Sequence, residues 1–117
     1  MAAITAEMVH QAYEAARCVY AGSLSRPAAR WEVAKATGMG PGSASDYITV
    51  FLSMIGGQCY KRTINLYATE YYLELIGQDY GRAAQQRADQ AVAAHVAYYR
   101  QVHAYLSKTD QLARRYL

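Results

Sequence analysis

Residues 43–57 have the sequence SASDYITVFLSMIGG, and this stretch decides the fold class. Its apolar residues recur three and four positions apart, which is the spacing of one buried face on an α-helix. Ser43 and Asp46 predict the start of this helix as a variant capping box, and Gly56-Gly57 predicts its end. The residues predicted to be buried are Ala44, Tyr47, Ile48, Phe51, Leu52 and Ile55.

The same helical spacing continues on both sides of this stretch, between capping and breaking residues. We predict helices from Thr5 to about Tyr20, from Ser25 to Gly38, from Asn65 to Gly77 and from Asp79 to about Leu106, followed by a short tail helix at about 107–117. Their predicted inward residues are Val9, Ala12, Tyr13, Ala16, Val19, Tyr20, Ala68, Tyr71, Tyr72, Leu75, Ile76, Ala88, Ala91, Val92, His95, Tyr99, Val102 and Leu106.

The composition agrees with this pattern and excludes several classes of protein. The chain has 117 residues, 53% of them apolar and only two of them proline, so it is long enough to bury a core of its own. No apolar run reaches the roughly 18 residues of a membrane span, so we expect a cytoplasmic protein without a membrane partner. We predict an all-α fold, a compact bundle of about five helices forming a single domain over residues 1–117.

Nothing in the sequence predicts catalysis, and we expect no enzyme activity and no cofactor. There is no nucleophile beside a base, no HExxH motif and no glycine-rich phosphate loop. Cys18 and Cys59 lie far apart without metal-ligand spacing, so they are predicted to be small buried side chains. Glu70 and Glu74 are interpreted as a solvated helix face, and His95 as a core histidine rather than a ligand.

Charge and tyrosine content indicate a binding role. The net charge is only +3, but residues 82–117 carry six cations against two acids, a balance of +4. The chain also has 12 tyrosines, whose apolar ring and polar tip suit binding surfaces as well as half-buried helix faces. We include Arg82 and Arg87 among the candidate contacts, because this basic segment attracts phosphate.

Residues 25–57 resemble a helix-turn-helix. The small and apolar residues Ala34, Gly38, Met39, Ala44 and Tyr47 have the spacing that lets two helices cross closely. The second helix presents Ser45 and Thr49 on its polar face, but it contains no Lys or Arg. Two interpretations therefore stay open, a DNA-reading helix and a purely structural hairpin.

The connection at residues 58–65 combines several groups that bind nucleic acids. Tyr60, Lys61, Arg62, Thr63 and Asn65 offer an aromatic ring, two cations, a hydroxyl and an amide within six residues. Such groups suit base stacking, phosphate contact and hydrogen bonding to base edges. The alternative for Asn65 is a capping role at the start of the next helix.

A family resemblance supports this interpretation. The segments concerned are Gly38-Met39, Ser43-Ala44, Asp46-Tyr47-Ile48, Tyr60-x-Arg62-Thr63-Ile64-Asn65, residues 68–73 (ATEYYL), Asp79-Tyr80-Gly81 and His95-Val96-x-Tyr98-Tyr99. Together they resemble the N-terminal helical domain of bacterial HNH endonucleases of the modification-dependent restriction type. The resemblance covers residues 4 to about 105 and implies a DNA-contacting module, with Tyr60, Arg62, Thr63, Asn65 and Thr69 as distinctive polar positions. No HNH motif follows.

Three functions compete on these grounds. The first is a non-catalytic nucleic-acid-binding module whose partner is DNA. The second is a phage-type anti-defence protein, similar in action to an anti-CRISPR, that inhibits a bacterial defence nuclease or effector by protein–protein binding. The third is a homodimer held together by exposed tyrosines.

Overall fold

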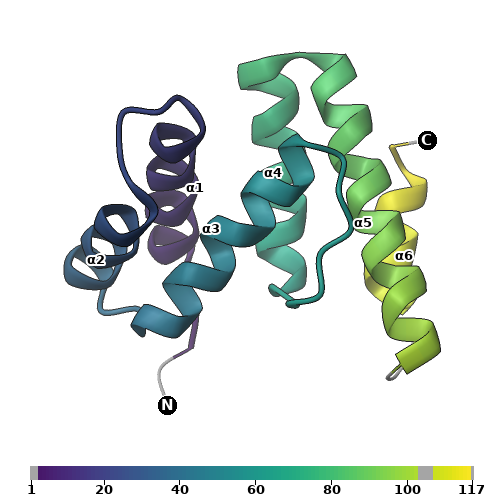
Figure 1. Ribbon diagram of the computed structural model, residues 1–117. Helices are drawn as coiled ribbons and strands as arrows, with labels where there is room; N and C mark the ends of the chain where they lie inside the picture. Colours follow the sequence, from purple (N-terminus) through teal and green to yellow (C-terminus); the bar gives the residue numbers. More distant parts are fainter. Residues whose placement is uncertain (1–2, 103–106, 117) are drawn as a thin grey trace. The chain divides into compact units, whose positions relative to one another are not determined.

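The structure, a computed structural model, describes residues 3–102 and 107–116. The described residues form α-helices and no strand, which confirms the all-α prediction (Figure 1). The helices are α1 (Ala6–Tyr20), α2 (Arg26–Thr37), α3 (Pro41–Ile55), α4 (Leu66–Tyr80), α5 (Arg82–Val102) and α6 (Ser107–Arg114). They group into two units, residues 1–52 and residues 53–117, and the division falls within α3. The prediction of a single domain stays a prediction.

In the first unit, α1 packs along α2, and local caps fix both helices. The side chains of Thr5 and Ser25 accept hydrogen bonds from backbone N–H groups in the first turn of α1 and α2, as the sequence predicts. Gly38 ends α2 in the left-handed conformation with φ 79°, which costs a glycine little because it lacks a Cβ atom.

The turn into α3 is shorter than predicted. The helix begins at Pro41 rather than Ser43, and the Gly40 carbonyl accepts the first helical hydrogen bond from the amide of Ala44. Proline is favoured at the first helical position because its fixed φ suits the helix and it needs no N–H partner there. Only Gly38, Met39 and Gly40 therefore separate α2 from α3, the turn length of a helix-turn-helix.

In the second unit, α4 and α5 form a helical hairpin, and α6 packs against both of them. The prediction that Gly77 ends α4 is wrong, because α4 continues to Tyr80 and α5 starts at Arg82. At Gly77, Gln85 of α5 instead packs closely against the backbone of α4. A Cβ atom at Gly77 would lie 2.4 Å from Gln85 Nε2, which donates a hydrogen bond to the carbonyl of Leu73 at 3.2 Å.

Most of the predicted inward residues are buried. Phe51 and Ile48 of the first unit and Ile76 and Val92 of the second are at most 1% exposed. One prediction is wrong: Tyr20 is 52% exposed at the end of α1. The partly buried residues are Val19, Leu52, Tyr71, Leu75 and Tyr99, and the side chains of Val102 and Leu106 lie outside the described residues.

Candidate nucleic-acid interface

The predicted binding loop, residues 58–65, is anchored to α5 through Tyr60 and His95. The Tyr60 ring is only 3% exposed and stacks on the His95 ring, with centroids 4.2 Å apart and planes 15° from parallel. Burial raises the pKa of the Tyr60 phenol, with a smaller contribution from the neighbouring Cys59. The prediction that Tyr60 stacks on a base is therefore wrong for this structure, because its ring is already covered.

His95 is a core histidine, as predicted, and its hydrogen bonds define its tautomer. Nδ1 lies 2.6 Å from the Tyr60 carbonyl oxygen, so this nitrogen carries the proton and donates. Nε2 then accepts from the Thr63 hydroxyl at 3.3 Å. Burial lowers the pKa of His95, and the bond to the Tyr60 carbonyl partly opposes that effect. Thr63 thus helps to hold the loop on α5.

Asn65 and Thr69 shape the start of α4. The Asn65 side-chain oxygen accepts from the amide of Ala68 at 2.7 Å, which confirms the capping alternative. Thr69 is 1% exposed, and its hydroxyl donates to the Asn65 carbonyl at 3.0 Å. Thr69 was predicted as a contact residue, but its side chain is covered and cannot touch a partner here.

We expect Asn65→Ala to lower the free energy of unfolding by about 1 kcal/mol, because the amide of Ala68 loses its partner. Urea denaturation measures this loss, and Asn65→Ser should retain most of the stability since serine is also a good cap. DNA binding per folded molecule should stay unchanged. Lost sequence discrimination at normal stability would instead assign Asn65 to base reading.

Lys61 and Arg62 are the exposed cations of this loop, in which only Tyr60 and Ile64 are buried. The Lys61 ammonium lies 5.8 Å from the centre of the Tyr98 ring of α5, a weak cation–π contact that leaves the charge at the surface. Both cations thus follow directly after the buried anchor at Tyr60. The structure keeps them together as a pair suited to phosphate contact.

The other predicted cations of the second unit have largely structural partners. Arg87 Nε donates to the Ile55 carbonyl at 3.5 Å, and Arg82 reaches Gln85 at the same distance. Arg100 and Arg114 both lie within 4 Å of Asp110. Arg115 pairs with Glu70 of α4. The basic character of residues 82–117 is therefore partly neutralised, which weakens the prediction that this segment attracts nucleic acid.

A second cluster lies in the first unit, where the sequence predicted only Ser45 and Thr49. Arg26 of α2 donates from Nη2 to the Thr49 hydroxyl of α3 at 2.5 Å. Arg26, Arg30 and Trp31 line a hollow together with Ser45 and Pro27. We call Arg26, Arg30, Ser45 and Thr49 the hairpin surface, and Trp31 lies at its edge.

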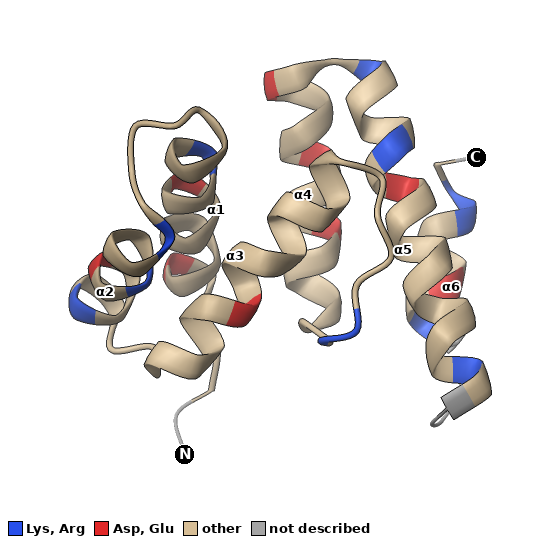
Figure 2. Ribbon diagram, viewed as in Figure 1, with Lys and Arg blue, Asp and Glu red and all other residues tan. Residues whose placement is uncertain are grey.

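The hairpin surface supplies the positive charge that α3 lacks. Figure 2 shows no blue segment on α3, whose only charged residue is Asp46, whereas α2 carries arginines. Among the described residues, neither Arg26 nor Arg30 has an acidic partner. The four-residue spacing of these arginines, which places them on one helix face, was a signal in the sequence that pointed to them.

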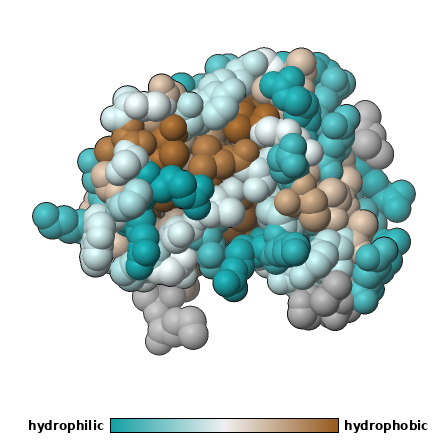
Figure 3. All heavy atoms as spheres, in the orientation of Figure 1, coloured by the Kyte–Doolittle hydropathy of each residue, from teal (hydrophilic) through white to brown (hydrophobic). Residues whose placement is uncertain are grey.

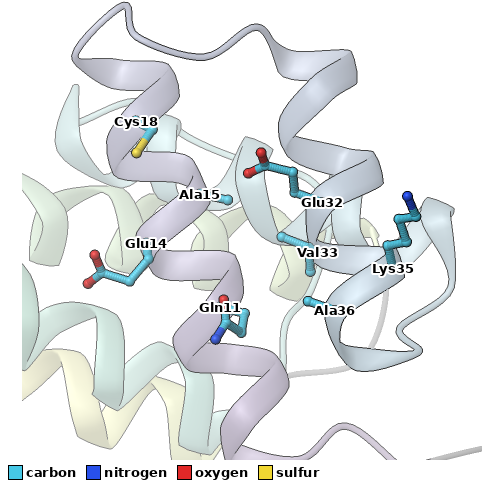
Figure 4. A pocket seen from close by; sticks show the side chains of 8 residues that line it. All are labelled: Gln11, Glu14, Ala15, Cys18, Glu32, Val33, Lys35 and Ala36. Atoms are coloured by element: carbon cyan, nitrogen blue, oxygen red, sulfur yellow. The ribbon is translucent and has the colours of Figure 1, made fainter.

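The groove between α1 and α2 has a different character (Figure 4). It has a volume of about 490 Å³, and the small apolar side chains of Ala15, Val33 and Ala36 lie between the two helices. Glu14 and Glu32 also line it, so it does not favour an anion. Cys18 borders it and is exposed, as is Cys59, so the prediction that both cysteines are buried is wrong.

Three comparisons bear on identity, and none finds a relative: no family model, curated protein or solved structure matches the chain. In the described part of the chain, no helix is both long and apolar enough to cross a membrane. Within residues 3–102 and 107–116, no three His, Cys, Asp or Glu side chains are grouped to hold a metal ion.

Proposed function

We propose that this chain is a non-catalytic nucleic-acid-binding module that contacts DNA through the hairpin surface. The observation that carries the proposal is the hydrogen bond from Arg26 to Thr49, which places a cation of α2 beside the polar face of α3. In a helix-turn-helix, residues near the start of the second helix approach base edges while the first helix contacts the backbone. Ser45 lies in the first half of α3 and Thr49 just past its middle. Arg26 and Arg30 are available for phosphate.

Two further features support this function. The three-residue turn at Gly38–Gly40 is the length that a helix-turn-helix uses. The resemblance to the N-terminal domain of HNH endonucleases points to the same partner. Lys61 and Arg62 of the second unit add a second cationic contact, which increases affinity through the phosphate backbone without reading sequence.

The test is DNA binding as a function of salt. We expect Lys61→Ala/Arg62→Ala to weaken binding to all sequences alike and to reduce the slope of log affinity against log salt by up to about two. Arg26→Ala/Arg30→Ala should reduce the slope by a similar amount. Fluorescence anisotropy of a labelled duplex measures both effects.

Lys35→Ala/Lys108→Ala is the matched control, because it removes two exposed charges outside both clusters. It should change the slope much less than either test variant. A parent protein that shows no salt-dependent DNA binding, or a control that loses as much as the test variants, would contradict the proposal.

The second candidate function is inhibition of a bacterial defence nuclease by protein–protein binding. The observation that favours it is a hollow of about 570 Å³ between α4 and α6, where Leu66 and Tyr67 are 41% and 49% exposed. Figure 3 also shows hydrophobic residues (brown) at the surface between hydrophilic ones. If the Lys61/Arg62 variant binds DNA like the parent but loses inhibition of a nuclease, this function replaces the first.

A further inference from the structure

Trp31 is an unusual residue to find at a surface. It is the only tryptophan of the chain, and 60% of it is exposed on α2. A large aromatic ring left in water forgoes the favourable free energy of burial, and tryptophan is enriched where a partner later covers it. We therefore expect the exposed ring to contact a ligand that has an apolar face.

The surroundings of Trp31 define the charge of that ligand. A hollow of about 210 Å³ lies between residues 26, 27, 30 and 31, which share one face of α2, and Ser45 of α3. The Arg30 guanidinium carbon lies 6.0 Å from the centre of the Trp31 ring. Among the described residues, no carboxylate lines the hollow, so its two arginines favour an anion beside the aromatic face.

We propose that this hollow binds an unpaired nucleobase together with its adjacent phosphate. The base stacks on Trp31, while Arg30, Arg26 and the Ser45 hydroxyl contact the phosphate. This inference rests on the proposed function and adds to it a second kind of ligand, nucleic acid that exposes an unpaired base, such as a single strand or an extrahelical nucleotide.

The volume of the hollow and the fixed position of Arg26 favour one base with its phosphate over a larger ligand. The hollow is smaller than the roughly 300–1,000 Å³ of pockets that enclose a drug-sized molecule, so it suits one planar ring rather than a whole cofactor. Stacking on an aromatic side chain accepts every base, because each base has a π-face, and arginine beside the stack adds phosphate contact. Arg26 is already held by Thr49, so less side-chain entropy is lost when it binds.

Trp31 also provides the readout, because its fluorescence is the only tryptophan emission of the protein. We would titrate the full chain with a dT 12-mer, an rU 12-mer, a blunt DNA hairpin duplex and the same duplex with one extrahelical base. We expect saturable quenching by every probe that exposes an unpaired base, and little quenching by the blunt duplex. A difference between dT and rU would identify the kind of strand, and quenching by either supports the proposal.

Variants then test the stacking itself by anisotropy of the labelled probes. Trp31→Ala should weaken binding to the dT 12-mer by about 5- to 100-fold and leave blunt-duplex binding within about twofold. Trp31→Phe, which keeps an aromatic face, should recover most of the affinity. Tyr20→Ala is the matched control, because it removes another exposed ring of the same unit and should change neither affinity.

The outcomes separate this inference from the proposed function. If Trp31→Ala binds the dT 12-mer like the parent, or if the blunt duplex quenches Trp31 as strongly as the unpaired probes, the stacking site is wrong while DNA binding stands. If the parent binds none of the four probes at low salt, both proposals fail. Unchanged circular dichroism of Trp31→Ala excludes misfolding as the cause of a loss.

Discussion

Phe51→Ala is expected to lower the free energy of unfolding by about 3 to 5 kcal/mol. Phe51 is fully buried on α3, and its ring meets that of Tyr13 edge to face, with centroids 5.2 Å apart and an interplanar angle of 89°. The substitution removes the apolar area of the ring, loses this aromatic contact and leaves a cavity, and each of these effects destabilises the fold. Chemical denaturation measures the change.

Tyr20→Ala is the control for this prediction, because it also truncates an aromatic side chain but at an exposed position of α1. It should change the free energy of unfolding by less than about 1 kcal/mol. If Phe51→Ala were as mild as Tyr20→Ala, Phe51 could not be in the core of the first unit.

The second large effect is a gain in stability from Asp89→Asn. Asp89 lies on α5 with only 1% of its surface exposed, and its Oδ1 has no hydrogen-bond partner in the described part of the chain. Burial raises the pKa of this carboxyl to about 6, so at neutral pH most molecules hold a buried charge whose Oδ1 has no partner among the described residues. Asparagine keeps the shape and removes the charge. We expect it to raise the free energy of unfolding by about 1 to 3 kcal/mol at pH 7.5.

The gain in the free energy of unfolding from Asp89→Asn should increase with pH. The pKa of Asp89 in the folded state, about 6, lies above the ordinary value of 3.8, so the folded state binds the proton more tightly than the unfolded state. The resulting stabilisation is complete below about pH 4 and is lost as the pH rises through 6. The advantage of Asp89→Asn over the parent should therefore be small at pH 4 and reach its full size above pH 6.

Other titratable groups contribute equally to the stability of the parent and of Asp89→Asn, so they cancel when the two free energies of unfolding are compared. His95, whose pKa is lowered by burial, makes the fold less stable as the pH falls below its ordinary value of 6.5, but it does so in parent and variant alike. Asp79→Asn, at an exposed position of α4, is the matched control and should give no such pH-dependent gain. An advantage of Asp89→Asn that does not change between pH 4 and 7.5 would contradict this account.

The starts of α1, α2 and α4 follow from short-range chemistry, which is why the sequence predicts these three well. Thr5, Ser25 and Asn65 each accept a hydrogen bond from an amide three residues along the chain. The groups involved are neighbours in the sequence whatever the rest of the fold does. The spacing of apolar residues likewise predicts the buried faces, because a helix places residues three and four apart on one side.

Helix ends and site residues depend on residues that are distant in the sequence. Gly77 is a plausible helix end by type, yet α4 continues through it, and Gln85 of α5 fills the space where another residue would have a Cβ atom. Tyr60 belongs to a loop whose composition predicts exposure, yet His95 of α5 covers its ring. No pattern within the loop contains that information.

The all-α fold, the N-caps at Thr5, Ser25 and Asn65 and most of the buried positions are thus predictable from the sequence, since they depend on local hydrogen bonds and helical periodicity. Which polar residues form a surface depends instead on the tertiary structure. It brings Arg26 to Thr49, 23 residues later, and buries Tyr60 and Thr69. The physical reason is that a side chain's exposure is set by what packs over it, and those partners come from other helices.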